Sequence, residues 1–149
     1  MSQSMLLLLH LICVGLWLGC IVTEVLFERA LLGRGRDQEL ILVDLHKHVD
    51  MFVEIPAFLI VLVTGILMLP ETSWNNMLLF KTACGTLAVV SNIYCVWLVF
   101  KRAAAANAGE WNEFEKVDHL QHKFGAVVLV SLIVGLAIGI SMPVYDMAT

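Results

Sequence analysis

Charged residues are scarce in this sequence. Only 15% of its 149 residues are Asp, Glu, Lys or Arg, while 60% are apolar. Soluble domains usually carry about 25% charged residues. The nine basic residues are too few and too dispersed for a polyphosphate-binding surface, and the net charge is −4. We therefore expect an integral membrane protein with no nucleic-acid partner.

Proline is also rare, with three residues in the whole chain, and long apolar runs make up most of the sequence. These runs cover 5–27, 51–69, 77–100 and 124–144. Each is near the ~20 residues that a spanning helix requires. The sequence predicts one all-α domain over 1–149, an integral membrane four-helix up-down bundle with helices at about 5–32, 40–69, 77–103 and 112–143. The 103–109 stretch is expected to be a small-residue connector.

Paired cysteine motifs are absent. The four cysteines lie within the apolar runs and include no CxxC spacing, which argues against a disulfide framework. Free cysteine mostly behaves as a small buried hydrophobe. We assign no redox role to these residues, which are Cys13, Cys20, Cys84 and Cys95.

Basic residues gather on one side of the predicted membrane. The turn at 70–76 carries none, and Lys81 is the single basic residue near the outer side. The other eight flank the two remaining connections. The positive-inside rule therefore places both termini outside the cytoplasm, periplasmic in a bacterial inner membrane. The eight residues are Arg29, Arg34, Arg36, Lys47, Lys101, Arg102, Lys116 and Lys123.

The most polar part of the second helix is the segment 44–54. In a helix, His46, Asp50 and Glu54 recur at i, i+4 and i+8 and form one line that runs from water into the membrane. Ionisable groups at that depth usually face the bundle interior and mark function. Pro56 follows Glu54 closely and is expected to kink the helix beside this buried charge.

A second histidine cluster begins the fourth helix. Up-down topology brings it to the same cytoplasmic end as the first cluster, where carboxylates of the first helix also lie. Every one of the four histidines has a carboxylate four residues away, as when an acid orients a metal-binding imidazole. Ordinary i, i+4 pairs on a solvated helix remain the alternative. The predicted site comprises His46, His48, Asp50, Glu54, His119, His122, Glu24 and Glu28.

His10 is the polar residue nearest the outer end of the first helix. It shares one helical stripe with Trp17 and Glu24. Two interpretations stay open: a core histidine bonded to a carbonyl group, or a ligand of a metal or haem. Lys81 of the third helix either reaches the outer surface or meets an anionic group beside His10.

The first helix also carries a resemblance. Leu9-His10, followed by Trp17-Leu18-Gly19, resembles the opening of the CopD and HemJ-type membrane proteins, small bundles in which such a histidine is linked to haem or copper. Met77-Leu78-Leu79-Phe80-Lys81 is similar to the start of a HemJ-type helix. The resemblance implies that His10 is a haem ligand and that Lys81 contacts a porphyrin propionate or the substrate. The 118–122 cluster is not part of that pattern.

We therefore expect a membrane protein that binds haem b and works as a small redox protein or oxidoreductase in electron transfer. Cofactor-binding candidates are His10, Lys81, His46, His48, His119 and His122. One alternative is a non-haem protein that binds Zn, Fe or Mn, or handles Cu, at the cytoplasmic His and carboxylate site. Another is an assembly subunit without a cofactor. Expected partners are the lipid bilayer, a membrane electron donor or acceptor such as a quinone, and further copies of the chain.

Overall fold

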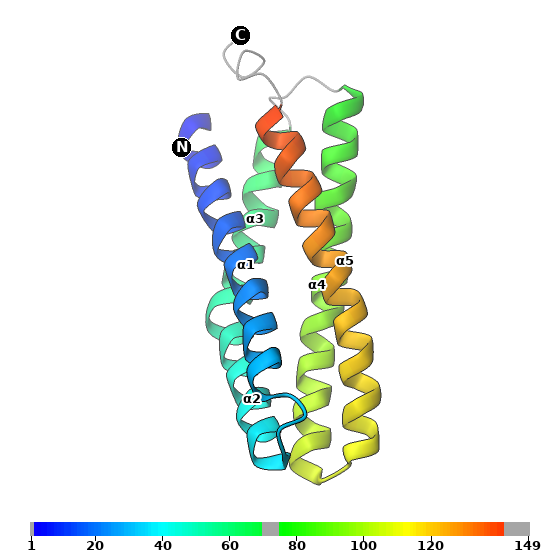
Figure 1. Ribbon diagram of the computed structural model, residues 1–149. Helices are drawn as coiled ribbons and strands as arrows, with labels where there is room; N and C mark the ends of the chain where they lie inside the picture. The colour runs from blue at the N-terminus through cyan, green and yellow to red at the C-terminus, as the bar shows by residue number, and fades with distance from the viewer. Residues whose placement is uncertain (1, 70–74, 142–149) are drawn as a thin grey trace.

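The structure is a computed structural model in which residues 2–69 and 75–141 are described. It confirms the all-α four-helix bundle (Figure 1). The first crossing is α1 (Gln3–Leu31). The second is continuous from α2 (Arg36–Val49) through η1 (Asp50–Glu54) to α3 (Ile55–Met68). The third is α4 (Asn76–Ala108) and the fourth is α5 (Trp111–Ser141).

All four crossings are long and apolar enough to span a membrane. Their outer faces carry large apolar side chains that protein does not cover. Leu8, Phe52 and Val90, for example, are exposed by 60%, 68% and 60%. A water-soluble bundle would hide such residues in its core, whereas lipid solvates them without penalty. The chain is an integral membrane protein.

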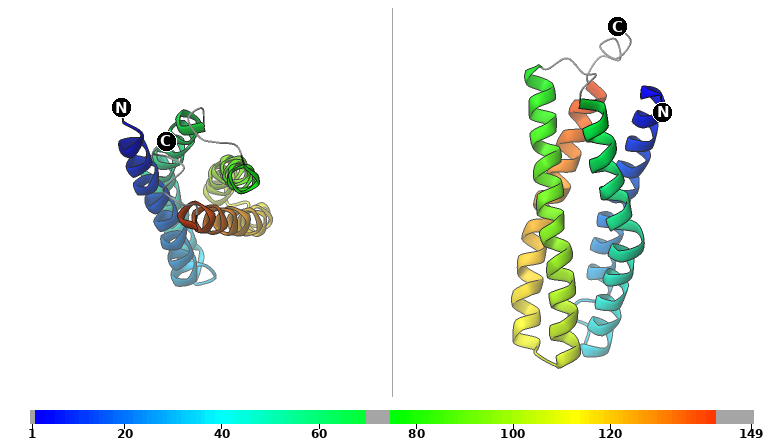
Figure 2. Two further views of the ribbon diagram at one scale, coloured as in Figure 1. Left: turned by 90° about the horizontal axis from the view of Figure 1, so that it is seen from above. Right: turned by 180° about the vertical axis from the view of Figure 1, so that it is seen from behind.

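The bundle consists of two closely packed helix pairs. α4 packs along α5, and α1 packs along α3; viewed from above, α5 leans from the side of α4 toward α1 (Figure 2). The start of α1 and the end of α5 lie at one end of the bundle, and the α1–α2 and α4–α5 turns lie at the other (Figure 1). We call the latter the turn end. Trp17 and Phe58 pack at the centre of the apolar core, with ring centroids 5.8 Å apart.

The connection between the third and fourth helices is shorter than predicted. The prediction of a connector at 103–109 was wrong, because α4 continues through four alanines to Ala108 and ends only at Gly109, whose φ of 73° is left-handed. Alanine is the best helix former and glycine readily adopts that conformation, so the helix ends at Ala108 and not at about residue 103, more than one turn later than expected. The 70–76 turn lies for the most part outside the described residues.

Pro56 does not simply kink the second crossing. The five residues before α3 form a π-helical turn, in which the Ile55 N–H donates to the Asp50 carbonyl instead of the usual i−4 acceptor. The wider turn relieves the clash that a proline ring makes with the carbonyl group four residues earlier. Its first and last residues are Asp50 and Glu54, and both are buried. Such turns often lie at functional sites.

Candidate functional site

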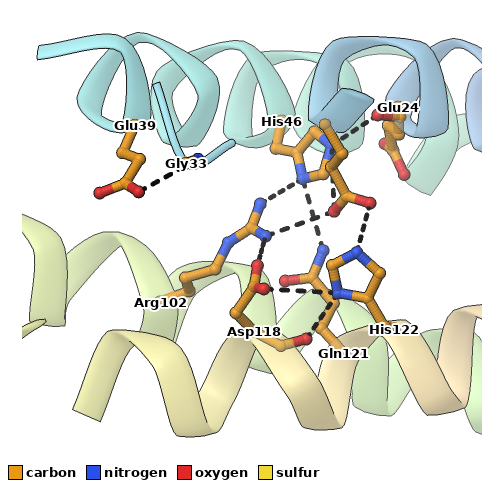
Figure 3. A network of polar contacts seen from close by, with 9 residues as sticks. Glu24, Gly33, Glu39, His46, Arg102, Asp118, Gln121 and His122 are labelled. Atoms are coloured by element: carbon orange, nitrogen blue, oxygen red, sulfur yellow. Dashed lines mark hydrogen bonds and ion pairs between the residues drawn. The ribbon is translucent and has the colours of Figure 1, made fainter. Parts of the chain in front are cut away.

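Arg102 of α4 is the centre of a buried polar network at the turn end (Figure 3). Its side chain has no exposed surface, and it contacts three other crossings. It donates hydrogen bonds to the Asp118 carboxylate at 2.5 Å, to the Glu28 carboxylate at 3.4 Å and to Nδ1 of His46. A guanidinium group can make these contacts together because it carries five N–H donors in a fixed plane.

His46 of α2 joins the network through both ring nitrogens. Nδ1 accepts from Arg102 and, at 3.4 Å, from the Gln121 amide, while Nε2 lies 3.5 Å from the Glu24 carbonyl oxygen and can donate to it (Figure 3). This pattern corresponds to the neutral Nε2–H tautomer. Because both nitrogens contact protein groups, His46 links α1, α2, α4 and α5 in this conformation.

His122 of α5 lies at the rim of the network, with its side chain 42% exposed. Its Nε2 is 2.8 Å from the Glu28 carboxylate, and its Nδ1 is 2.8 Å from the Asp118 carbonyl oxygen. One ligand atom each from Glu28, Asp118 and His122 lies within 4.8 Å of the others, so the three could hold a metal ion. Arg102 already binds both carboxylates, however, and supplies a positive charge there.

The other two predicted histidines do not join this network. His48 is exposed, and its Nδ1 donates to the Asp44 carbonyl oxygen at 2.7 Å. It follows His46 by two residues, a rotation of about 200° around the helix, so the two cannot share a face. His119 is exposed as well. The polar network therefore lacks two of the four histidines that the sequence analysis grouped together.

A group of three carboxylates continues the site toward the bundle centre. Asp50 and Glu54 are only 2% and 3% exposed, so the predicted line from His46 is buried along its length. Glu24 of α1 joins them, and ligand atoms of the three lie within 4.8 Å of one another. They line a cavity of about 180 Å³ that also reaches His46, Gln121 and His122. His122 forms its ion pairs with Glu28 and Asp118 and not with these three carboxylates.

His10 belongs to a separate place in the other half of the bundle. It lies fourteen residues before Glu24 on α1, or ~21 Å at 1.5 Å per residue. Its Nδ1 is 2.9 Å from the Thr64 hydroxyl of α3. Lys81 of α4 is close enough to interact with it electrostatically. The structure therefore brings His10 and Lys81 together but keeps them away from the turn-end histidines.

Sequence reasoning missed the role of Arg102, which it counted as a loop charge for membrane orientation. The available signal was that Arg102 precedes four alanines, which extend the helix and keep its charge within the bundle. Gln121 and Thr64 were also missed. A single polar residue in an apolar helix indicates an interhelical contact but does not identify the partner.

No protein-family model, curated protein or solved structure matches this chain.

Proposed function

We propose that this chain is a membrane-integral redox protein that binds haem b through His10. The observation that carries the proposal is the arrangement around His10, whose Nδ1 is hydrogen-bonded to Thr64 and which interacts electrostatically with Lys81. The two residues come from different helices and form the pair that the HemJ-type resemblance implies. The integral membrane bundle is the setting that such a protein requires.

Thr64 determines which nitrogen of His10 is available. The Thr64 hydroxyl donates to the Ile60 carbonyl at 2.6 Å, so it accepts the hydrogen bond from His10 Nδ1–H at 2.9 Å. Nε2 then keeps its lone pair, as a neutral imidazole ligand requires. A hydrogen bond on the far nitrogen also fixes the ring and raises its basicity toward a metal. The donor chemistry of the site therefore fits haem iron.

Lys81 supplies the positive charge that a propionate group needs. The side chain of Lys81 lies against Gly139 of α5, where an added Cβ would come within 3.3 Å of the lysine Nζ. Glycine at that position leaves room for the lysine inside the bundle. When bound, haem would supply the one-electron chemistry, and the protein residues would hold and orient it. A quinone or another membrane carrier would exchange the electron.

The distance along α1 separates His10 from the histidines of the turn end. Glu24 lies ~21 Å from His10 at helical rise, and His46 contacts the Glu24 carbonyl oxygen. His10 and the turn-end histidines therefore cannot hold the same haem. His10 would be the one histidine of this chain that holds it.

The loop charges support an orientation for this site. The turn end carries most of the basic residues and would face the cytoplasm of a bacterium, with both termini periplasmic in the inner membrane. His10 and Lys81 would then lie in the periplasmic half of the bilayer.

A non-haem metal protein is the second candidate function. It is favoured by Glu28, Asp118 and His122, which together offer oxygen and nitrogen ligands suited to Zn, Fe, Mn or Cu. Binding there would displace contacts that Arg102 makes with both carboxylates.

A visible spectrum of protein made with ample haem tests the proposal. We expect a Soret band with about one haem per chain, lost in His10→Ala and kept in the matched control His48→Ala, which removes an exposed histidine. Absence of the band, together with stoichiometric Zn, Fe, Mn or Cu by elemental analysis, would replace haem by the metal function. Protein that contains neither haem nor a stoichiometric metal would favour the assembly subunit.

A further inference from the structure

Three carboxylates deep in the bundle, those of Glu24, Asp50 and Glu54, take part neither in the proposed haem site nor in the contacts of Arg102. Asp50 begins the π-helical turn and Glu54 ends it, and Glu24 faces them from α1. One oxygen of each accepts no hydrogen bond from any described residue, although all three atoms are buried. Buried oxygens without partners are costly, and three in one place call for a common partner.

Gln121 adds a fourth oxygen to the same cavity. Its side chain comes from α5 and is only 7% exposed. The amide nitrogen is used by His46, but Oε1 has no donor among the described residues. Gln121 lines the cavity together with Glu24, Asp50 and Glu54. A carboxylate without a partner can take up a proton, but an amide oxygen cannot. The unpaired Oε1 of Gln121 therefore points to a ligand that is coordinated by oxygen atoms.

Charge balance points to a cation. The buried polar groups include five carboxylates, which belong to the three deep residues, Glu28 and Asp118. Arg102 is the one permanent cation that bonds to this set within the described residues. His46 is neutral in this conformation, so even with His122 protonated three negative charges would remain if all five carboxylates were ionised. No lysine or arginine side chain among the described residues lines the cavity to balance them.

We propose that Glu24, Asp50 and Glu54 bind one hard divalent cation, of the Mg²⁺, Ca²⁺ or Mn²⁺ class, in this cavity. An all-oxygen ligand set is what such ions prefer, and it is unsuited to soft metals. Two positive charges would cancel most of the negative charge that remains. The cavity of about 180 Å³ holds the ion with a few waters, since a water takes up about 30 Å³.

Binding of Mn²⁺ to purified, metal-depleted protein tests this site. Electron paramagnetic resonance should show one bound Mn²⁺ per chain, and Mg²⁺ or Ca²⁺ should displace it. Asp50→Asn and Glu54→Gln keep the side-chain shape and should each weaken binding at least tenfold. Asp44→Asn is the matched control, because Asp44 lies on the same crossing with its side chain 71% exposed, and it should bind as the wild type does.

Two results would overturn the proposal: no saturable Mn²⁺ binding at millimolar concentration, or equal binding in both variants. If a variant does not fold, the wild-type protein decides, because a bound ion must raise the melting temperature in a saturable way. No rise with Ca²⁺ against chelator would then refute the site. His10→Ala should keep the Mn²⁺ signal, so a failure of the haem proposal is distinguishable from a failure of this one.

Discussion

Removal of Arg102 should be the most destabilising single change in the turn-end network. Arg102→Met keeps most of the side-chain volume but removes the cation that bonds to Asp118 and Glu28. Both carboxylates would then keep only the half-exposed His122 as a partner, and His46 would lose its strongest donor. Breaking a buried pair from one side typically costs about 3–5 kcal/mol. We expect a loss in that range, a large part of the roughly 5–15 kcal/mol by which native proteins are stable.

The assay is reversible unfolding in mixed detergent micelles, with the neighbouring lysine as control. Lys101 forms an ion pair with Glu113 in which both side chains are well exposed, so Lys101→Met removes the same charge one residue away at little cost. A further variant, Arg102→Met with Asp118→Asn, should recover part of the loss because it removes one stranded charge. If Arg102→Met unfolds no more easily than Lys101→Met, the network does not stabilise the bundle as argued.

Two further predictions concern the other half of the bundle and its orientation. Thr64→Val removes the hydroxyl that accepts from His10 Nδ1 and keeps the shape of the side chain. Haem content should fall, while the free energy of unfolding stays close to that of the wild type. Unchanged haem content would show that Thr64 does not position the ligand. Cysteine at Arg34, in the exposed α1–α2 turn, should resist an impermeant thiol reagent in intact cells, whereas cysteine at Asn76 should react. The reverse pattern would invert the topology.

The bundle itself was predictable because lipid imposes simple rules. Apolar runs of the right length, interrupted at 70–76 and by charged segments, determine the number and order of helices. The ends were less certain, as the extension of α4 to Ala108 shows. The helix propensity of the alanines favoured that extension. Lys101 and Arg102, which precede the alanines, suggested the start of a loop.

The site was predictable where it depends on spacing within one helix. A four-residue repeat aligns His46, Asp50 and Glu54 on one face whatever their neighbours are, and all three are buried. The same rule also separates His48 from His46, a conclusion that helical rotation alone could have given. Contacts between helices were harder, because the height and rotation of α4 against α2 determine that Arg102 meets His46. No periodicity within one segment contains that information.

The stripe on α1 explains why this bundle has two polar places rather than one. His10, Trp17 and Glu24 are spaced by seven residues, so they lie on nearly the same face of the helix at intervals of ~10 Å. Trp17, between them, is almost fully buried and packs on Phe58 in the apolar core. This layer of core side chains separates His10 from the carboxylates around Glu24 and leaves no charged residue on the stripe between them. Each place must therefore balance its own charge: the positive charge of Lys81 beside a neutral His10, and the negative charge of the three carboxylates, cannot offset each other across this layer.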